Sequence, residues 1–312
     1  MDSPAIDRFE AGRGRLASLA YRLLGSAADA EDAVQDTFLR WQAADPQHIR
    51  MPEAWLTKVV TNVCLDRLRS AQARHERAAG DWMPEPLLEG DPMLGPAETV
   101  EQRASVSLAV LTILERLSPV ERAAFVLHEA FSYPHAEIAG ILDITESASQ
   151  QHIHRARRRV TTERRVGDEV DPASARRIVE EFLAAATSGR TERLVALLTA
   201  DATAVSDGFG LARRLLRFTT RERVASYVRA GFTPTPAKRR LAGGSPAMHI
   251  ALVNGSPAVL AVTDDRVVGA VVFEVGDGKV SSLWGIAAAH RLVRLNEAWR
   301  QHQPDTPVVS TW

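Results

Sequence analysis

The stretch PHAEIAGILDIT spans residues 134–145 and is followed at once by a helical pattern over residues 146–160. A helix-turn-helix needs a short helix, a tight turn and a second helix, with a small residue where the two helices approach closely. Ala139 supplies the small residue, and Thr145 is a suitable N-cap for the second helix. The stretch therefore predicts a helix-turn-helix. The residues that would face its first helix are Ile144, Ile153, Ala156 and Val160.

The other face of the second helix carries side chains of the types that contact base edges in a DNA groove. They are Ser147, Gln150, Gln151 and His154. A run of arginines follows, and such cations neutralise DNA phosphates. Glu163 is the acidic residue within this run. These are Arg155, Arg157, Arg158, Arg159, Arg164 and Arg165. A solvated basic face would need no DNA, but the turn, the cap and the arginines occur together, so we favour a DNA-binding face. His152 and His154 point to different sides of the helix, which argues against zinc binding.

Upstream, the sequence predicts further helices over residues 102–165. Ser118, Pro119 and Glu121 form a strong start signal, because an N-cap serine, a proline at the first position and a glutamate at the third can close a capping box.

An earlier helix has an acidic face. Ser26 and Asp29 make a plausible N-cap pair for a helix whose apolar side holds Ala33, Val34, Phe38 and Leu39. Its polar side holds Asp29, Glu31, Asp32, Gln35 and Asp36. Negative charge in the first turns complements the helix dipole, and it would equally suit a surface that docks on another protein. The sequence leaves these two interpretations open.

The next predicted helix runs from Pro52 to about Ser70, with Trp55 more consistent with the core than with base stacking. Its predicted core residues are Leu56, Val59, Val60, Val63, Cys64 and Leu68. Its polar side holds Lys58, Thr61, Asn62, Asp66 and Arg69, and basic character continues through Arg67, Arg74 and Arg77. Cations for phosphate and small polar groups for base edges suit an unstacked single strand, although a solvated helix face would look similar.

The rest of the chain divides at two boundaries. Residues 81–101 hold six carboxylates, no Lys or Arg, and several Pro and Gly, which predicts a flexible linker. A second boundary falls near residues 167–172. Beyond it we expect helices near 173–187 and 192–198, and then β-strands. The predicted strands are 248–253, 258–263, 267–275 and 280–286, with a hairpin turn at 276–278, so the C-terminal domain is predicted to be α+β.

Composition bounds the class of protein. The chain has 312 residues, a formal net charge of -1 and one cysteine, Cys64, so two or three domains are expected and no internal disulfide can form. The first ten residues have no basic segment followed by an apolar run, and no stretch of 18 apolar residues occurs. We therefore expect a cytoplasmic protein that has no membrane partner, metal or cofactor.

Together, these motifs resemble a known family. Residues 20–41 (AYRLLGSAADAEDAVQDTFLRW) resemble regions 2.1 to 2.2 of bacterial RNA polymerase sigma factors of the extracytoplasmic function (ECF) group, and residues 54–70 (AWLTKVVTNVCLDRLRS) resemble regions 2.3 to 2.4. The helix-turn-helix resembles region 4.2. The C-terminal part resembles the SnoaL-like, nuclear-transport-factor-2-like cone, and the segment WMPEP at 82–86 resembles the linker motif of the subgroup that carries this fusion.

The resemblance implies roles by position. Asp29, Asp32, Gln35 and Asp36 would dock on the clamp coiled coil of core RNA polymerase, and the second module would contact its flap. Lys58, Thr61, Asn62, Asp66 and Arg69 would contact the melted -10 element. Ser147, Gln150, Gln151, His154, Arg155 and Arg158 would contact the -35 duplex. The linker residues Trp82, Pro84, Glu85 and Pro86 would make an intramolecular contact through which the C-terminal domain regulates the sigma modules.

The implied fold class is two all-α sigma modules followed by an α+β SnoaL-like cone. The expected limits are region 2 at 1–78, the linker at 79–101, region 4 at 102–166, the cone at 172–300 and a tail at 301–312. Some SnoaL-like cones are enzymes, so Asp207, His249 and Trp284 are candidate pocket residues, but no visible partner set supports catalysis. A ligand-sensing regulator with one helix-turn-helix would leave residues 7–77 unexplained. One departure from the subgroup is Phe209, in DGFGL at 207–211, where the subgroup has Asp-Gly-Gly-Gly-Lys.

Overall fold

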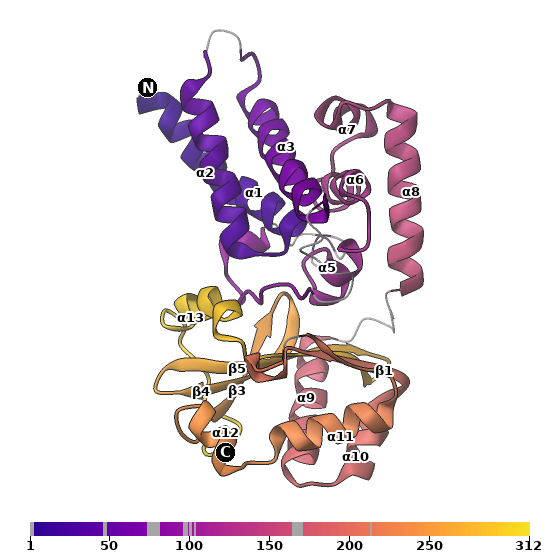
Figure 1. Cartoon of the computed structure of the whole chain (residues 1–312), viewed down its shortest axis with the longest axis vertical. Helices are drawn as coiled ribbons and strands as arrows, with labels where there is room; N and C mark the ends of the chain where they lie inside the picture. Colours follow the sequence, from indigo (N-terminus) through magenta and orange to yellow (C-terminus); the bar gives the residue numbers. More distant parts are fainter. Residues whose placement is uncertain are drawn as a thin grey trace. The chain divides into compact units, whose positions relative to one another are not determined.

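The computed structural model describes residues 3–45, 49–73, 82–95, 99, 102, 104–163, 171–212 and 214–312. Contacts divide the chain into two compact units (Figure 1). The first comprises Met1–Glu85 and Gly90–Arg164, and the second comprises Pro86–Glu89 and Arg165–Trp312. The first unit is helical and the second combines helices with a sheet, which confirms the predicted order of fold classes.

The first unit is built from two helical modules. The N-terminal module contains α1 (Ser3–Leu24), α2 (Ala27–Ala43) and α3 (Pro52–Ala73), which pack against one another. The short 3-10 helix η2 (Pro92–Leu94) packs on α1. The second helical module contains α5 (Leu108–Leu114), α6 (Pro119–Glu129), α7 (His135–Leu142) and α8 (Glu146–Glu163). Helices α1 and α3 also contact α6, and α3 contacts α7, so the two modules share one compact unit.

The helix starts follow the predicted caps. Ser26 accepts a hydrogen bond from the Asp29 backbone N–H, and Ser118 and Glu121 form the complete capping box that begins α6. The Thr145 hydroxyl accepts from Ala148 N–H at 3.1 Å at the start of α8. Each cap satisfies backbone donors that the first turn of a helix leaves unpaired, which is why these boundaries could be predicted.

Two buried arginines connect α1 with later segments of the first unit. Arg22 of α1 is 1% exposed and donates to the Ser105 hydroxyl at 2.9 Å and to the Leu94 carbonyl at 2.7 Å. Burial lowers the pKa of Arg22 to about 10, so it remains charged at neutral pH. Arg122 of α6 donates to the Leu23 carbonyl of α1 at 2.8 Å. A buried guanidinium must be hydrogen-bonded, and these contacts therefore hold the two modules in a defined arrangement.

The linker is anchored where it is described, in contrast to the flexible tether that its composition predicts. The Glu85 backbone N–H donates to the Gly25 carbonyl at 3.0 Å, and its carboxylate accepts from Ser26 Oγ and Ala27 N, both at 2.9 Å. Glu85 thereby caps α2. Met83 is buried, and the Trp82 ring occupies the space that a side chain at Gly25, whose φ is +66°, would need.

The next four residues, 86–89, belong to the second unit, where they extend the edge of its sheet. Leu88 forms a β-bridge with Val253. Leu87 N donates to Asn254 Oδ1 at 2.8 Å, and Asn254 N donates to the Leu87 carbonyl at 2.9 Å. Glu89 N donates to the Leu252 carbonyl at 3.0 Å. Leu87 and Leu88 are buried, so this part of the linker is a structural element of the C-terminal domain.

Among the described residues of the second unit, six strands form one sheet in the order β2-β1-β6-β5-β4-β3. Their bounds are β1 Leu198–Ser206, β2 Leu216–Phe218, β3 Ala247–Val253, β4 Ser256–Thr263, β5 Arg266–Gly276 and β6 Lys279–Ile286. The helices are α9 Pro172–Thr187, α10 Thr191–Leu197, α11 Arg221–Phe232, α12 Pro236–Leu241 and α13 Val293–Trp299. Strand β1 pairs parallel to β6, and β3 to β6 form an antiparallel meander.

The core of this domain lies between the sheet and α9, α10 and α11. It includes Phe182, Leu194, Val228, Phe273 and Leu283. The predicted β5–β6 hairpin is present, with positive φ at Asp277 and Gly278 as a two-residue hairpin turn requires.

The residues expected to form a tail are part of the domain. Val309 pairs with Met248. Trp312 is buried in the core, and its Nε1 donates to the Phe232 carbonyl at 2.6 Å.

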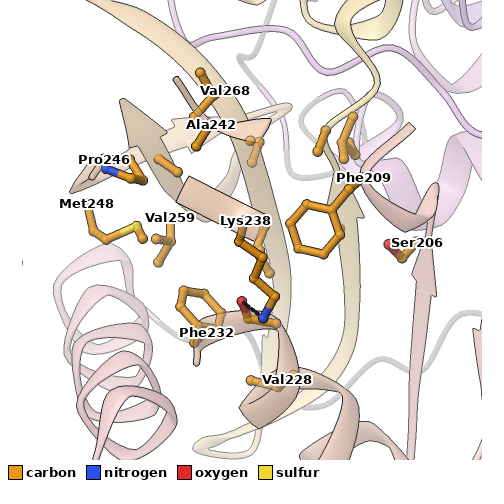
Figure 2. A pocket seen from close by; sticks show the side chains of 18 of the residues that line it. Ser206, Phe209, Val228, Phe232, Lys238, Ala242, Pro246, Met248, Val259 and Val268 are labelled. Carbon is orange, nitrogen blue, oxygen red and sulfur yellow. Dashed lines mark hydrogen bonds between the residues drawn. The ribbon is translucent and has the colours of Figure 1, made fainter. Parts of the chain in front are cut away.

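A cavity of about 170 Å³ lies within this domain, between the inner face of the sheet and helices α11 and α12 (Figure 2). Its wall is mostly apolar, with Ser206, Asp207, Tyr227 and Lys238 as polar lining residues.

Candidate nucleic-acid-binding site

The helix-turn-helix is present as predicted. Helix α7 ends at Leu142, and its C-cap residue Asp143 has the left-handed φ of 53° that a tight turn requires; α8 begins three residues after Asp143. Ile153, Ala156 and Val160 are buried as expected, whereas Ile144 is only partly buried. Ser149 is also fully buried, because it lies on the same side of α8.

All six residues predicted to contact the -35 duplex lie exposed on α8. They are Ser147, Gln150, Gln151, His154, Arg155 and Arg158. Arg157 and Arg159 are exposed as well, whereas Arg164 and Arg165 lie outside the described residues. The helix therefore presents polar groups and cations together on its accessible surface, which suits a duplex whose groove and phosphates are both contacted.

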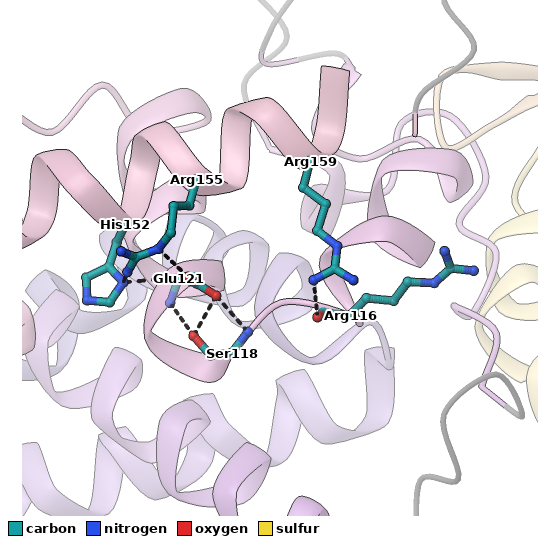
Figure 3. A network of polar contacts seen from close by, with 6 residues as sticks. All are labelled: Arg116, Ser118, Glu121, His152, Arg155 and Arg159. Atoms are coloured by element: carbon teal, nitrogen blue, oxygen red, sulfur yellow. Dashed lines mark hydrogen bonds and ion pairs between the residues drawn. The ribbon is translucent and has the colours of Figure 1, made fainter. Parts of the chain in front are cut away.

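Two carboxylates of α6 hold this helix: Glu129 accepts from Arg157 Nε at 2.7 Å, and Glu121 accepts from Arg155 (Figure 3). Glu121 Oε2 accepts from Ser118 N at 3.2 Å and Ser118 Oγ at 2.9 Å, and Oε1 accepts from Arg155 Nε at 2.8 Å. Partial burial raises the pKa of Glu121, but the hydrogen bonds from Arg155 and Ser118 outweigh it and hold the pKa below its ordinary value. Arg155 is thus tied to α6, a contact that the sequence did not reveal.

Helix α3 carries the residues predicted to contact a single strand, with one difference. Asn62 is partly exposed, and Asp66 and Arg69 are exposed. Thr61 is completely buried and donates to the Thr57 carbonyl at 2.7 Å, so the expectation that it lies on the exposed side was wrong. Of the predicted core residues of α3, Val59 is only partly buried. Trp55 is partly buried and packs on Trp41, whereas Arg74 and Arg77 lie outside the described residues.

Lys58 of α3 is engaged by the second helical module. Its Nζ lies 2.6 Å from Asp143 Oδ1 and 2.8 Å from the Gly140 carbonyl, both at the end of α7. Nearby, Tyr133 receives a hydrogen bond from Arg15 of α1 at 2.9 Å and shares one with Thr57 of α3 at 3.1 Å. In this arrangement part of the α3 face is covered by the helix-turn-helix.

The acidic face of α2 is accessible. Asp32 and Gln35 are exposed, while Asp29 and Asp36 are partly exposed. Arg67 of α3 lies 2.7 Å from Asp36 and 3.8 Å from Asp32. Leu39, expected in the core, is instead 55% exposed. The accessible surface of α2 therefore combines carboxylates with an exposed apolar side chain.

The cavity of the C-terminal domain holds one of its three candidate residues. Asp207 lines it and accepts from the Ala287 and Ala288 backbone N–H groups. His249 and Trp284 do not line it, because neighbouring strand residues face opposite sides and Met248, Leu283 and Gly285 take the cavity side. His249 instead packs its ring against Trp299 and contacts the Asp305 carbonyl.

Within the described part of the chain, no cluster of three or more His, Cys, Asp or Glu side chains is arranged to hold a metal ion. Nor does any helix among the described ranges combine the length and apolarity needed to span a bilayer.

Comparison with known proteins gives consistent matches. Residues 8–74 match the family model described as Sigma-70 region 2, and residues 107–160 match the model described as Sigma-70, region 4. The chain is 36% identical over 308 residues to the ECF RNA polymerase sigma factor SigJ of Mycobacterium tuberculosis. The aligned region covers 96% of this chain and 96% of that protein. It is 31% identical over 285 residues to the probable ECF RNA polymerase sigma factor SigI of the same species, covering 90% of this chain and 92% of that protein.

Among solved structures, the crystal structure of the M. tuberculosis extracytoplasmic function sigma factor SigJ matches with a TM-score of 0.69 and 34% sequence identity. The match covers 93% of this chain and 98% of that one, so it includes both helical modules and the α+β domain.

Proposed function

Because the chain belongs to the ECF RNA polymerase sigma factors, we propose that it binds core RNA polymerase in the cytoplasm and directs it to promoters with defined -10 and -35 elements. The observation that carries this proposal is the exposed face of α8, where groove-contacting side chains and arginines occur together on the second helix of a helix-turn-helix. This face would contact the -35 duplex, with Gln150 and His154 at base edges and Arg155 and Arg158 at phosphates.

Helix α3 would contact the melted -10 strand through Lys58, Asn62, Asp66 and Arg69. Thr61 has no part in this contact because it is buried. Lys58 is held by Asp143 in the arrangement described here, so it would become available to DNA only when the two helical modules separate. The proposal therefore includes a closed state of the first unit that does not present the complete -10 surface.

Helix α2 would dock on the clamp coiled coil of the polymerase, through Asp32, Gln35 and Asp36 with the exposed Leu39 beside them. The second helical module would contact the flap. Asp29 is partly buried and its backbone carbonyl accepts from Arg67 at 3.2 Å, so it contributes more to the packing of α2 than to docking.

The C-terminal domain would modulate these activities through the linker. Glu85 is bound to the start of α2, while Leu87, Leu88 and Glu89 pair with the end of β3 and the residue after it. A change in the C-terminal domain could therefore be passed along a few residues of chain to the N-terminal module. Trp82, Pro84, Glu85 and Pro86 remain the proposed residues of this intramolecular contact.

Run-off transcription with purified core polymerase tests the proposed function. The template would carry a promoter mapped after overexpression of this protein, and a scrambled -35 element would serve as the control template. We expect a defined transcript only when core enzyme, this protein and the intact promoter are all present. A protein that binds the promoter but never makes core enzyme start there would be a regulator of another class, and the proposal would fail.

A further inference from the structure

The cavity of the C-terminal domain has the size and lining of a site for a small molecule. At about 170 Å³ it has room for a benzene-sized guest. Its sheet side is formed by short apolar side chains, among them Val259, Ala261 and Val271, and Phe232 closes it on the helix side. Larger side chains on the sheet would fill this space. Instead, two small residues, Ala261 of β4 and Gly269 of β5, are paired there and leave it open.

The polar groups of the cavity include a carboxylate and two hydroxyls. Asp207 is 6% exposed, and its Oδ2 accepts from Ala287 N at 2.9 Å and from Ala288 N at 2.8 Å. A carboxylate has about four acceptor positions, so capacity remains for a donor from a guest. Burial raises the pKa of Tyr227, a hydrogen bond with Ser206 opposes this, and the charge of Asp207 adds to the rise. The Tyr227 phenol is therefore protonated at neutral pH.

Glycine at position 285 allows two hydroxyls of the cavity wall to approach strand β6 closely. A Cβ there would lie 2.8 Å from the Tyr227 hydroxyl and 3.2 Å from Ser206 Oγ, closer than unstrained contacts allow. Gly285 thus makes room for the Tyr227 and Ser206 hydroxyls against strand β6.

Among the described residues that line the cavity, the cation Lys238 is already hydrogen-bonded, which argues against an anionic guest. Lys238 donates to three backbone carbonyls at the end of α11, those of Ala230, Gly231 (3.2 Å) and Thr233 (2.8 Å). An ammonium has three N–H donors, so none is left for a ligand. With Asp207 also present, a negatively charged molecule would meet repulsion, whereas a neutral donor would be accepted.

Phe209 places a strained side chain at the cavity. Its φ is +62°, in the left-handed region that a bulky residue rarely adopts, and it lies between Gly208 and Gly210, which have similar positive values. Its ring lines the cavity although the residue is 42% exposed (Figure 2). Leu241 likewise lines the cavity and is 55% exposed. Strain of this kind persists at ligand sites, and a bound apolar molecule would cover both side chains.

We propose that this cavity binds a small uncharged molecule with an apolar, benzene-sized body and one hydroxyl or N–H group, which donates a hydrogen bond to Asp207 beside Tyr227 while Phe209 covers the apolar end. The inference goes beyond the promoter-directing function, and its test requires neither polymerase nor DNA, so the two can fail independently.

Calorimetric titration of the full-length protein with phenol, toluene and benzoate tests the proposal. We expect phenol to bind about tenfold more tightly than toluene, because a hydrogen bond to a charged acceptor adds to the same apolar contact. Benzoate should give no measurable binding. Crystals soaked with 4-bromophenol should show an anomalous bromine peak inside the cavity, which locates the probe directly.

Three variants and one matched control sharpen the test. Ala261→Leu fills the cavity and should abolish binding of phenol and toluene, whereas Ala184→Leu, an exposed position on α9, should leave both unchanged. Tyr227→Phe should reduce the preference for phenol over toluene. Phe209→Gly should weaken the binding of both probes at least threefold. It should not lower the melting temperature, because it removes a strained residue. If Phe209 had only a structural role, the variant would not show both results together.

The proposal is overturned if neither phenol nor toluene binds at millimolar concentration, or if the bromine peak lies elsewhere. Equal binding of benzoate and phenol would also overturn it. If Ala261→Leu does not fold, the Phe209→Gly and Tyr227→Phe titrations decide the outcome alone, and unchanged affinities in both would exclude this cavity as the site.

Discussion

Lys58 Nζ and Asp143 Oδ1 lie 2.6 Å apart and join α3 to the turn of the helix-turn-helix. The lysine is a proposed contact of the -10 strand, and the aspartate ends the helix that precedes α8, the proposed -35 recognition helix. One ion pair therefore involves both proposed DNA-binding modules, and it cannot persist while Lys58 contacts a phosphate.

Removal of this ion pair should favour DNA binding by the free protein. Asp143→Asn keeps a residue that tolerates the left-handed conformation and removes the charge. We expect affinity for a labelled single strand carrying the -10 element to rise about 1.5- to fivefold, since exposed ion pairs contribute about 0.2–1 kcal/mol. Fluorescence anisotropy measures it. Asp264→Asn, another exposed left-handed aspartate, is the control, and an equal gain there would remove the explanation.

Charge on α2 should govern polymerase binding. Asp32→Lys reverses an exposed charge, and we expect affinity for core polymerase to fall about tenfold because complementary potentials are lost. Asp36 is less suitable for reversal, because a lysine there would face Arg67 and disturb the packing of α2 on α3. Glu10→Lys, which makes the same charge change on α1, should bind normally in a thermophoresis assay. If the wild-type protein and both variants bind core polymerase with equal affinity, the acidic face only complements the helix dipole and is not a docking surface.

Residues of α8 should separate into two classes. Arg158→Ala should weaken binding to promoter and random duplexes alike and reduce the slope of log affinity against log salt by about 1. Gln150→Ala should instead change the preferred -35 sequence, with a loss of about 1–3 kcal/mol on the cognate duplex. Titrations at several salt concentrations on both duplexes distinguish them. Indistinguishable profiles for the two variants would refute the assigned roles.

The pairing of the linker with the C-terminal domain should affect transcription. Asn254→Gly tolerates φ of 53° but deletes the amide that accepts from Leu87 N. An unsatisfied buried N–H costs about 1–3 kcal/mol, so the Leu87 and Glu89 amides should exchange with solvent roughly tenfold faster. Run-off output at the cognate promoter should change with them. Asp265→Gly, an exposed residue with φ of 58°, is the control. Faster exchange with unaltered output would show that the linker contact is not regulatory.

Local signals predicted the helical modules well. Ser118 with Glu121, Thr145 and Ser26 are caps whose chemistry is complete within three or four residues, so sequence suffices to place them. The exposed face of α8 follows from helical periodicity for the same reason. Thr61 was misassigned because a hydroxyl can bond to the carbonyl four residues earlier, here that of Thr57, and so be buried without a distant partner.

Contacts between distant segments were not predictable. Arg22 meets Ser105 and Leu94 across more than 70 residues, and nothing local marks it as buried. Strand β1 was also missed; it pairs in parallel with β6, about 80 residues further along the chain. The prediction that His249 and Trp284 line the cavity was wrong, because each side chain lies on the face of its strand that points away from the cavity. The face that a strand residue occupies can be assigned only when the register of the sheet is known.

The carboxylate of Glu121 has a consequence for the response of the protein to acid. Its folded-state pKa is depressed, so its stabilising contribution is present above the unfolded pKa and is lost as pH falls through the folded value. A single proton would then weaken the capping of α6 and the attachment of Arg155 together. Acidification would therefore weaken one of the two ties between α8 and α6, while the ion pair of Arg157 with Glu129 remains, and would add net positive charge beside the proposed -35 contacts.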